Sequence, residues 1–205
     1  MVKMNKTLEF ILNRYKINWD GETPIIELPY SRWFEYTVLM KDLGFTSGVE
    51  IGVYRGRFTQ ALKEANKDLN IIGVDAWRSY KGYKDYEEDD LANYSYSRAQ
   101  ERASKYGFKL IRAWSLDAVK EFEDNSLDFV FIDGNHDFRH VTEDVDEWSK
   151  KVRPGGIVSG HDFFKNYHEG YGVREALPAW CDANRIKPLF VMTKDKCPSW
   201  LYVKE

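Results

Sequence analysis

Acidic and imidazole side chains lie at the ends of two apolar runs in the second half of the chain. Asp133 ends the run LDFVFID, and His161 and Asp162 end the run GGIVSGHD. If these runs are neighbouring parallel strands, their carboxyl ends meet at one edge of the sheet. Two carboxylates and an imidazole are acceptable ligands for a divalent cation. Asp133, His161 and Asp162 are therefore candidate metal ligands, unless Asp133 only orients a helix N-terminus and His161 only binds backbone.

A second motif follows an earlier apolar run and is suited to a nucleoside. The segment EIGVYRG contains Glu50, Gly52 and Gly56, and the next apolar run, IIGVDAW, places Asp75 near its carboxyl end. Glycines let the backbone pass close to a ligand, and a helix N-terminus presents unpaired N–H groups. An acid at the end of the following strand can accept both hydroxyls of a ribose.

The spacing of these glycines separates two classes of cofactor. Dinucleotide-binding folds usually carry G-x-G-x-x-G, whereas this segment reads E-x-G-x-x-x-G. Glu50 would repel a pyrophosphate, but it suits a cofactor that bears an ammonium group, such as S-adenosylmethionine. The competing interpretation is a tight structural turn, with the strand-end acid merely capping the next helix.

These motifs need parallel strands covered by helices to position them. Apolar runs at 49–53, 71–77, 108–113, 127–133 and 155–162 are each followed by a stretch with helical spacing of its apolar residues. Strands that are apolar throughout, rather than alternating, are typical of a parallel sheet that is buried on both faces. The pattern predicts an α/β fold.

Both ends of the chain depart from this alternation. PLFVMT and SWLYVK, near the C-terminus, are joined by a connection too short for a parallel crossover, so they must be antiparallel neighbours. Residues 5–17 and 31–43 have helical spacing, and IIELPY between them is extended or turn-like. We therefore expect a doubly wound, mostly parallel seven-stranded sheet with a reversed final strand. A helical cap segment (1–47) precedes a single cofactor-binding domain (48–205).

Composition limits the partners of the chain. Its 30 basic and 33 acidic residues give a net charge of −3, which provides no general attraction for nucleic acid or anionic lipid. Two cysteines cannot form a disulfide framework or a four-cysteine zinc site, and they fit a reducing compartment. No apolar stretch suits a signal peptide or a membrane span. We expect a cytoplasmic protein with neither nucleic acid nor membrane as a partner.

Four segments together resemble the successive motifs of a known family. VEIGVYRG, IIGVDAW, SLDFVFIDGNHDFRHVTEDVDEW and VRPGGIVSGHDF are similar to motifs of the class I S-adenosylmethionine-dependent methyltransferases. The branch they resemble holds small-molecule and sugar O-methyltransferases related to the catechol O-methyltransferases. The resemblance covers residues 48–203 and implies a Rossmann-like methyltransferase fold with S-adenosylmethionine as the cofactor. In relatives, the region before it often closes over the substrate.

The resemblance also implies roles for individual residues around the cofactor. The glycine turn lines the methionine part, Asp75 takes the ribose, Ala76 and Trp77 flank the adenine, and Ser115 lies near the edge of the adenine. The full set of cofactor-binding residues implied in this way is Glu50, Gly52, Val53, Tyr54, Gly56, Asp75, Ala76, Trp77, Ser115 and Asp133.

Methyl transfer to oxygen needs an acceptor that is deprotonated, or nearly so, and in line with the sulfonium. In the catechol branch, positions matching Asp133, His161 and Asp162 bind magnesium, and a lysine base stands three residues after the first of them. Here that position is His136, and an imidazole with a pKa of about 6.5 suits a general base. We expect His136 and Asp133 to be catalytic. His161 departs from the oxygen ligand of the pattern, so the site takes magnesium or a softer ion, or His161 is no ligand, or no metal binds.

The leading hypothesis is an enzyme that methylates a hydroxyl of a small molecule, a sugar or a related metabolite, with or without a divalent metal. The aromatic stretch 77–97 either forms part of a lid over the acceptor or packs structurally. The alternatives are an NAD-dependent oxidoreductase on a Rossmann-type sheet and a non-catalytic S-adenosylmethionine-binding module. The N-terminal helices could support a homodimer.

Overall fold

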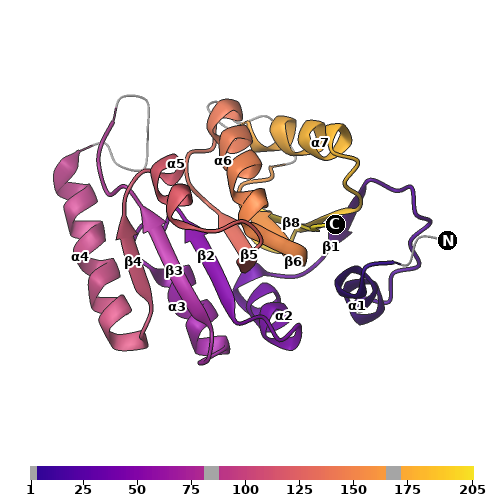
Figure 1. Cartoon of the computed structure of the whole chain (residues 1–205), viewed down its shortest axis with the longest axis horizontal. Helices are drawn as coiled ribbons and strands as arrows, with labels where there is room; N and C mark the ends of the chain where they lie inside the picture. Colours follow the sequence, from indigo (N-terminus) through magenta and orange to yellow (C-terminus); the bar gives the residue numbers. More distant parts are fainter. Residues whose placement is uncertain (1–3, 81–87, 165–171) are drawn as a thin grey trace.

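One eight-stranded sheet forms the centre of the molecule, as Figure 1 shows. The computed structural model describes residues 4–80, 88–164 and 172–205. The strands are β1 (Ile25–Leu28), β2 (Ser47–Ile51), β3 (Asn70–Asp75), β4 (Lys109–Arg112), β5 (Leu127–Ile132), β6 (Val152–Gly160), β7 (Leu189–Met192) and β8 (Ser199–Val203). Their order across the sheet is β1-β7-β8-β6-β5-β2-β3-β4.

The expected reversed strand is confirmed, but the expected count of seven strands is wrong. β8 runs antiparallel to both of its neighbours, β6 and β7, while the other pairs are parallel. The additional strand is β1, from the segment IIELPY, which pairs in parallel with β7. Its backbone covers the free edge of β7, since the N–H of Leu189 donates to the carbonyl of Pro24 and that of Thr193 to Leu28. β1 thus takes the place of β7 as the edge strand on this side of the sheet.

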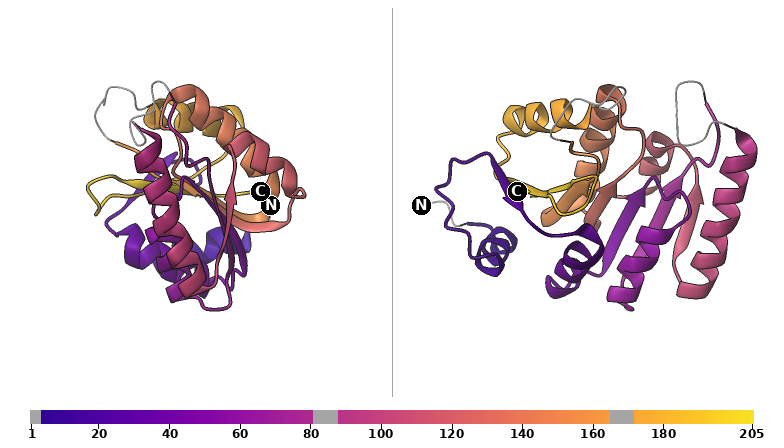
Figure 2. Two further views of the ribbon diagram at one scale, coloured as in Figure 1. Left: turned by 90° about the vertical axis from the view of Figure 1, so that its left-hand side faces the viewer. Right: turned by 180° about the vertical axis from the view of Figure 1, so that it is seen from behind.

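Helices cover both faces of the sheet, as Figures 1 and 2 show. The helical segments are α1 (Lys6–Arg14), the π-helix η1 (Arg32–Tyr36), α2 (Thr37–Asp42), α3 (Arg57–Ala65), α4 (Asp89–Tyr106), α5 (Ser115–Ala118), the 3₁₀ helix η2 (Val119–Glu121), α6 (Phe138–Lys151) and α7 (Val173–Ala183). α5, α6 and α7 pack on one face, and α1 to α4 pack on the other. The doubly wound arrangement predicted from the sequence is confirmed.

β5 shows why the strands read as continuous apolar runs. All six of its residues are buried, and successive side chains point to opposite faces. Val130 and Ile132 join the core beneath α6 and α7, whereas Phe129 and Phe131 join the core beneath α1, α2 and α3. With helices on both sides, neither face of the strand can be polar.

The N-terminal segment is part of the same packing unit as the rest of the chain. Leu8, Ile11 and Leu12 of α1 lie in the core that β5 shares with α2 and α3. Its strand β1 closes the sheet, and the π-helix η1 leads directly into α2. The predicted boundary between a cap segment (1–47) and a cofactor-binding domain (48–205) stays a prediction. β2 begins at Ser47, and the core packing is continuous across this boundary.

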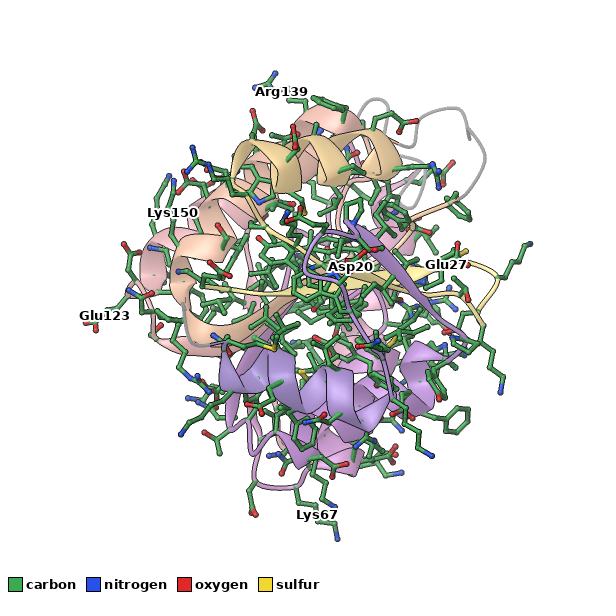
Figure 3. All side chains as sticks on the ribbon, turned by 90° about the vertical axis from the view of Figure 1, so that its right-hand side faces the viewer. Asp20, Glu27, Lys67, Glu123, Arg139 and Lys150 are labelled. Carbon is green, nitrogen blue, oxygen red and sulfur yellow. The ribbon has the colours of Figure 1, made fainter. Side chains whose placement is uncertain are left out.

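The surface is polar around these layers. Charged side chains such as Lys67, Glu123 and Arg139 project from the periphery in Figure 3. Among the helices of the described ranges, none combines the length and apolar character that a bilayer crossing needs.

Candidate active site

The sheet reverses its direction of winding between β2 and β5, which are neighbours at its centre. From β2 the chain builds outward through β3 and β4, and it then returns to add β5 and β6 on the other side. The carboxyl ends of strands at such a switch point diverge and leave a crevice. The residues at the ends of β2, β3, β5 and β6 are those that the sequence singled out.

A cavity of about 430 Å³ lies at this end of the sheet. Its walls come from the ends of β2, β3 and β4, from the loop after β5, and from α5 and α6. The lining residues are Ile51, Gly52, Val74, Asp75, Ala76, Arg78, Tyr80, Ala113, Trp114, Ser115, Leu116, Gly134, Asn135, Arg139, His140, Glu143 and Asp144. This volume and mixed lining are typical of a small-molecule site. Of the predicted cofactor residues, Gly52, Asp75, Ala76 and Ser115 line the cavity.

Asp75 organises the turn after β2. Its Oδ2 accepts the backbone N–H of Tyr54 at 2.9 Å, and its Oδ1 accepts that of Trp77 at 2.8 Å. Both of these residues have positive φ angles, which non-glycine residues rarely adopt. The carboxylate therefore holds together the two loops that follow β2 and β3.

Trp77 does not lie where the resemblance implied. Its side chain is fully buried between β3 and α4, where it packs against Val53, Ala92 and Ala99. Its indole N–H donates to the carbonyl of Tyr54. The ring thus supports the wall of the cavity from behind and does not flank a ligand. Val53 is buried in the same cluster.

Glu50 lies behind the cavity wall. Its carboxyl group is almost completely buried and accepts a hydrogen bond from the hydroxyl of Thr59 on α3. Burial raises the pKa of Glu50 to about 8, with a further contribution from the negative charge of Asp133. At neutral pH the group is mainly protonated, until a cation comes close enough to stabilise its charge.

The opposite wall of the cavity carries three hydrogen-bonded side chains, of which only one was predicted from the sequence. Ser115 was predicted, and its hydroxyl donates to Asp144 and accepts the indole N–H of Trp148 at 2.8 Å. Asp144 lines the cavity, and burial raises its pKa to about 6. An acid in the middle of a helix gives no signal by its spacing, because only the packing of α6 on β5 turns it toward the cavity.

Four predicted residues meet beside this cavity, at the ends of β5 and β6. The Nδ1 atom of His136 lies 3.2 Å from Oδ2 of Asp162. The Nδ1 atom of His161 lies 3.4 Å from the same oxygen and 3.5 Å from Oδ1 of Asp133. All four side chains are largely buried. The parallel pairing of β5 with β6 brings the two acids together, as the sequence predicted.

A fifth side chain completes this cluster and was not predicted. Arg32 of η1 extends from the N-terminal segment, and its Nη1 atom lies 3.0 Å from Oδ2 of Asp133. The guanidinium group stacks above the rings of Trp33, Phe58 and Phe131. Neither the spacing nor the local pattern of the sequence links residues so far apart, so only the fold could reveal this contact.

The electrostatics of the cluster are set by its ion pairs. Burial would raise the pKa of Asp133, but His161 and Arg32 hold it well below its usual range. Burial would lower the pKa of His161, but the carboxylates of Asp133 and Asp162 raise it to about 9. At neutral pH His161 is therefore an imidazolium.

The charges of Asp133 and His161 affect the metal site that we expected from the sequence. One ligand atom each of Asp133, His136 and Asp162 lies within 4.8 Å of the others, so their spacing alone would suit a cation. However, both oxygens of Asp133 already face positive groups, Arg32 and His161. His161 is not one of these three residues, and its Nδ1 atom already faces oxygens of both acids. The residues as arranged do not fit a metal ion.

One predicted feature lies partly outside the described residues. The aromatic stretch 77–97 includes residues 81–87, which the structure does not describe, so its function as a lid stays a prediction. Within the described part, Tyr80 lines the cavity, and its hydroxyl accepts a hydrogen bond from the amide of Asn135 at 2.7 Å.

The sequence of the chain matches the model of one known protein family. A family model described as a methyltransferase domain matches residues 49–163, more than half of the chain. The chain belongs to this methyltransferase family. The matched region contains the glycine turn, Asp75, Asp133 and Asp162, whereas Arg32 lies outside it.

Solved methyltransferase structures share the fold of the whole chain. An O-methyltransferase from Bacillus cereus in complex with S-adenosylhomocysteine has a TM-score of 0.63 and 15% identity, over 100% of this chain and 93% of that one. The O-methyltransferase TomG from Streptomyces achromogenes, in complex with S-adenosylmethionine, has a TM-score of 0.61 and 16% identity, over 100% and 92%. The Rossmann-like methyltransferase fold expected from the sequence is confirmed.

A curated relative is more similar in sequence. The uncharacterized protein y4gI of Sinorhizobium fredii (strain NBRC 101917 / NGR234) is 25% identical over 166 residues, which are 78% of this chain and 17% of the relative. The chain thus spans about a sixth of the length of this curated relative.

Proposed function

We propose that this methyltransferase uses S-adenosylmethionine and methylates a hydroxyl group of a small molecule. The observation that carries the proposal is the position of the cavity. Gly52, Asp75, Gly134 and Asn135 are among the residues that line it, and the residue that follows Asn135 in the chain is His136. A cofactor in this cavity would therefore lie beside the cluster of ionisable groups. The S-adenosyl ligands of the two compared structures support this cofactor.

In this proposal the nucleoside occupies the cavity. Asp75 receives the ribose hydroxyls, because each oxygen of a carboxylate can accept more than one hydrogen bond. Ser115 and Asp144 border the adenine from the opposite wall. The ammonium group of the methionine part would approach Glu50, whose carboxyl ionises when a cation is near.

His136 takes the proton of the acceptor. Asp162, at 3.2 Å from Nδ1, holds the imidazole ring in one orientation and stabilises the positive charge that it gains. The acceptor O–H bond breaks as its proton moves to the other ring nitrogen, Nε2. The oxygen then attacks the methyl carbon, and the carbon–sulfur bond breaks with its electron pair left on sulfur, which gives S-adenosylhomocysteine. A sugar or a related hydroxylated metabolite would suit this chemistry.

Two alternatives weighed on the sequence lose support. Membership of the methyltransferase family excludes the oxidoreductase interpretation. A non-catalytic binding module would have no need of a buried histidine and carboxylate pair beside the cofactor cavity. Metal assistance is not part of the proposal, because Arg32 and His161 already contact the oxygens of Asp133.

Replacement of His136 by alanine tests the proposal. Release of S-adenosylhomocysteine would be measured with a panel of hydroxylated acceptors, and cofactor binding would be measured by calorimetry. We expect kcat to fall by roughly 10² to 10⁴-fold, because a general base is lost, with cofactor affinity retained.

A second histidine provides the matched control. His140 borders the cavity, and its Nδ1 atom lies 2.7 Å from Asp137 in the first turn of α6. His140→Ala should leave kcat unchanged at saturating cofactor. If His136→Ala retained the turnover of the wild type, the assignment of the base would be wrong.

A further inference from the structure

A cation from the N-terminal segment already lies against Asp133, one of the predicted metal ligands. Nη1 of Arg32 contacts Oδ2 of Asp133 at 3.0 Å, and only 12% of the arginine side chain is exposed. The aromatic rings of Trp33 and Phe58 lie 5.0 Å from the centre of the guanidinium group, which shields it from water. A shielded ion pair is screened far less than one in bulk solvent.

The position of Arg32 is fixed from two distant parts of the chain. Ser31 caps the π-helix η1, and π-helical turns are frequent at functional sites. Asp195, in the connection between β7 and β8, accepts the hydroxyl of Ser31 at 2.7 Å and the backbone N–H of Arg32 at 2.8 Å. The fold thus anchors the backbone of this arginine as well as its side chain.

The remaining contacts leave little room for a second cation. His161 bridges Oδ1 of Asp133 and Oδ2 of Asp162, and His136 faces the same oxygen of Asp162. A divalent ion at Asp133 would have to displace Arg32 from the carboxylate or share the carboxylate with it. Displacement would leave a buried guanidinium group without its partner, sharing would place two cations side by side, and both effects are unfavourable.

We propose that Arg32 is the resident cation of the methyl-transfer site and excludes a divalent metal from it. The inference rests on the function proposed above. An arginine stays charged under all working conditions, and it carries five N–H donors in a rigid plane. Its Nε atom has no hydrogen-bond partner among the described residues. The guanidinium group therefore has an N–H donor beyond the one in its ion pair with Asp133. The guanidinium stabilises the negative charge that develops on the acceptor oxygen as His136 removes its proton.

Binding of Mn²⁺ alone, followed by electron paramagnetic resonance, tests the exclusion without any acceptor. The wild type should bind Mn²⁺ no more tightly than Asp133→Asn does. Arg32→Met should bind Mn²⁺ roughly tenfold or more tightly than the wild type, as changes next to metal ligands usually shift affinity by this amount. The double variant Arg32→Met, Asp133→Asn should lose that binding again.

Arg14→Met is the matched control. Arg14 of α1 also pairs with two acids, Glu35 and Asp42, but it lies outside the cluster. Its replacement should leave Mn²⁺ binding at the level of the wild type. Arg32→Lys keeps the positive charge in a different geometry, so it should continue to exclude Mn²⁺. It is the control for a substitution of Arg32 that retains a cation at this position.

Two further readouts separate this inference from the proposed function. Binding of S-adenosylhomocysteine should be retained in Arg32→Met, and turnover of the wild type should be unaffected by EDTA. Mn²⁺ binding by the wild type that Asp133→Asn abolishes would overturn the inference, and so would an Arg32→Met variant that binds no more Mn²⁺ than the wild type. Failure of the wild type to bind S-adenosylhomocysteine would instead overturn the proposed function.

Discussion

Glu50 illustrates how the surroundings of one residue decide its chemistry. Three charged groups act on its buried carboxyl: Asp133 and Asp75 disfavour ionisation, and Arg32 favours it. Desolvation outweighs the attraction to Arg32, so the pKa rises from 4.5 to about 8. In the unfolded chain the same group ionises near its ordinary value.

This difference predicts how stability depends on pH. Because the folded state holds the proton of Glu50 more tightly, the stabilisation is complete below pH 4.5 and is lost as pH rises toward 8. Each pH unit in this window costs on the order of 1 kcal/mol from this group. Thermal melts without cofactor should therefore show a smaller loss of Tm between pH 5 and 8 in Glu50→Gln than in the wild type. Parallel curves for the two proteins would contradict the burial argument.

Residues at strand ends were predictable, and residues that reach the site by long-range packing were not. Asp75, Asp133 and Asp162 follow apolar runs, so strand topology alone brings them to one edge. Arg32 enters through a π-helix that local sequence does not indicate. Trp77 was assigned to the ligand, but the positive φ at this residue turns its ring into the core.

Between β2 and β5, one glycine lets two strand ends approach each other closely. Gly52 has a φ of +83°, and a Cβ atom there would lie 1.8 Å from the carbonyl oxygen of Asp133. The N–H of Asp133 donates to the carbonyl of Ile51 at 2.7 Å, which fixes this approach. The glycine was predicted to admit a ligand, and it also admits the neighbouring strand.

Gly52→Ala should therefore destabilise the fold strongly. We expect a loss of roughly 3 kcal/mol or more, from backbone strain and from a clash with the backbone of β5. Gly107→Ala is the control, since Gly107 also has a positive φ but no atom lies within 4 Å of its Cβ position. Its cost should be only the strain of about 1–2 kcal/mol. Urea unfolding measures both, and equal losses would contradict the close approach.

The elements themselves were largely predictable, except for the edge strand. The parallel strands could be predicted from continuous apolar runs, because helices bury both of their faces, as in β5. β1 has four residues, of which only Leu28 is buried, so its pattern carries no clear period. Whether the N-terminal helices support a homodimer stays a prediction.

Considered as a whole, the molecule joins a methyltransferase sheet to an N-terminal segment that completes both the sheet and the site. The first contribution is β1, which covers the edge of β7, and the second is Arg32, which pairs with Asp133. The doubly wound arrangement and the reversed final strand followed from the sequence, because a parallel sheet with one short antiparallel hairpin allows few topologies. The cytoplasmic location stays a prediction.

The central claim is that an S-adenosyl cofactor lies across the carboxyl ends of β2 and β3, with its ribose on Asp75. Calorimetric titration with S-adenosylhomocysteine tests it most directly, with NAD as the comparison ligand. The account predicts binding of one S-adenosylhomocysteine per chain, no binding of NAD, and an affinity lowered by roughly tenfold or more in Asp75→Ala, since a buried hydrogen-bonding partner is lost. Asp68→Ala, in the exposed turn before β3, should bind like the wild type. No heat from S-adenosylhomocysteine with folded protein, or equal affinity in Asp75→Ala, would contradict the account.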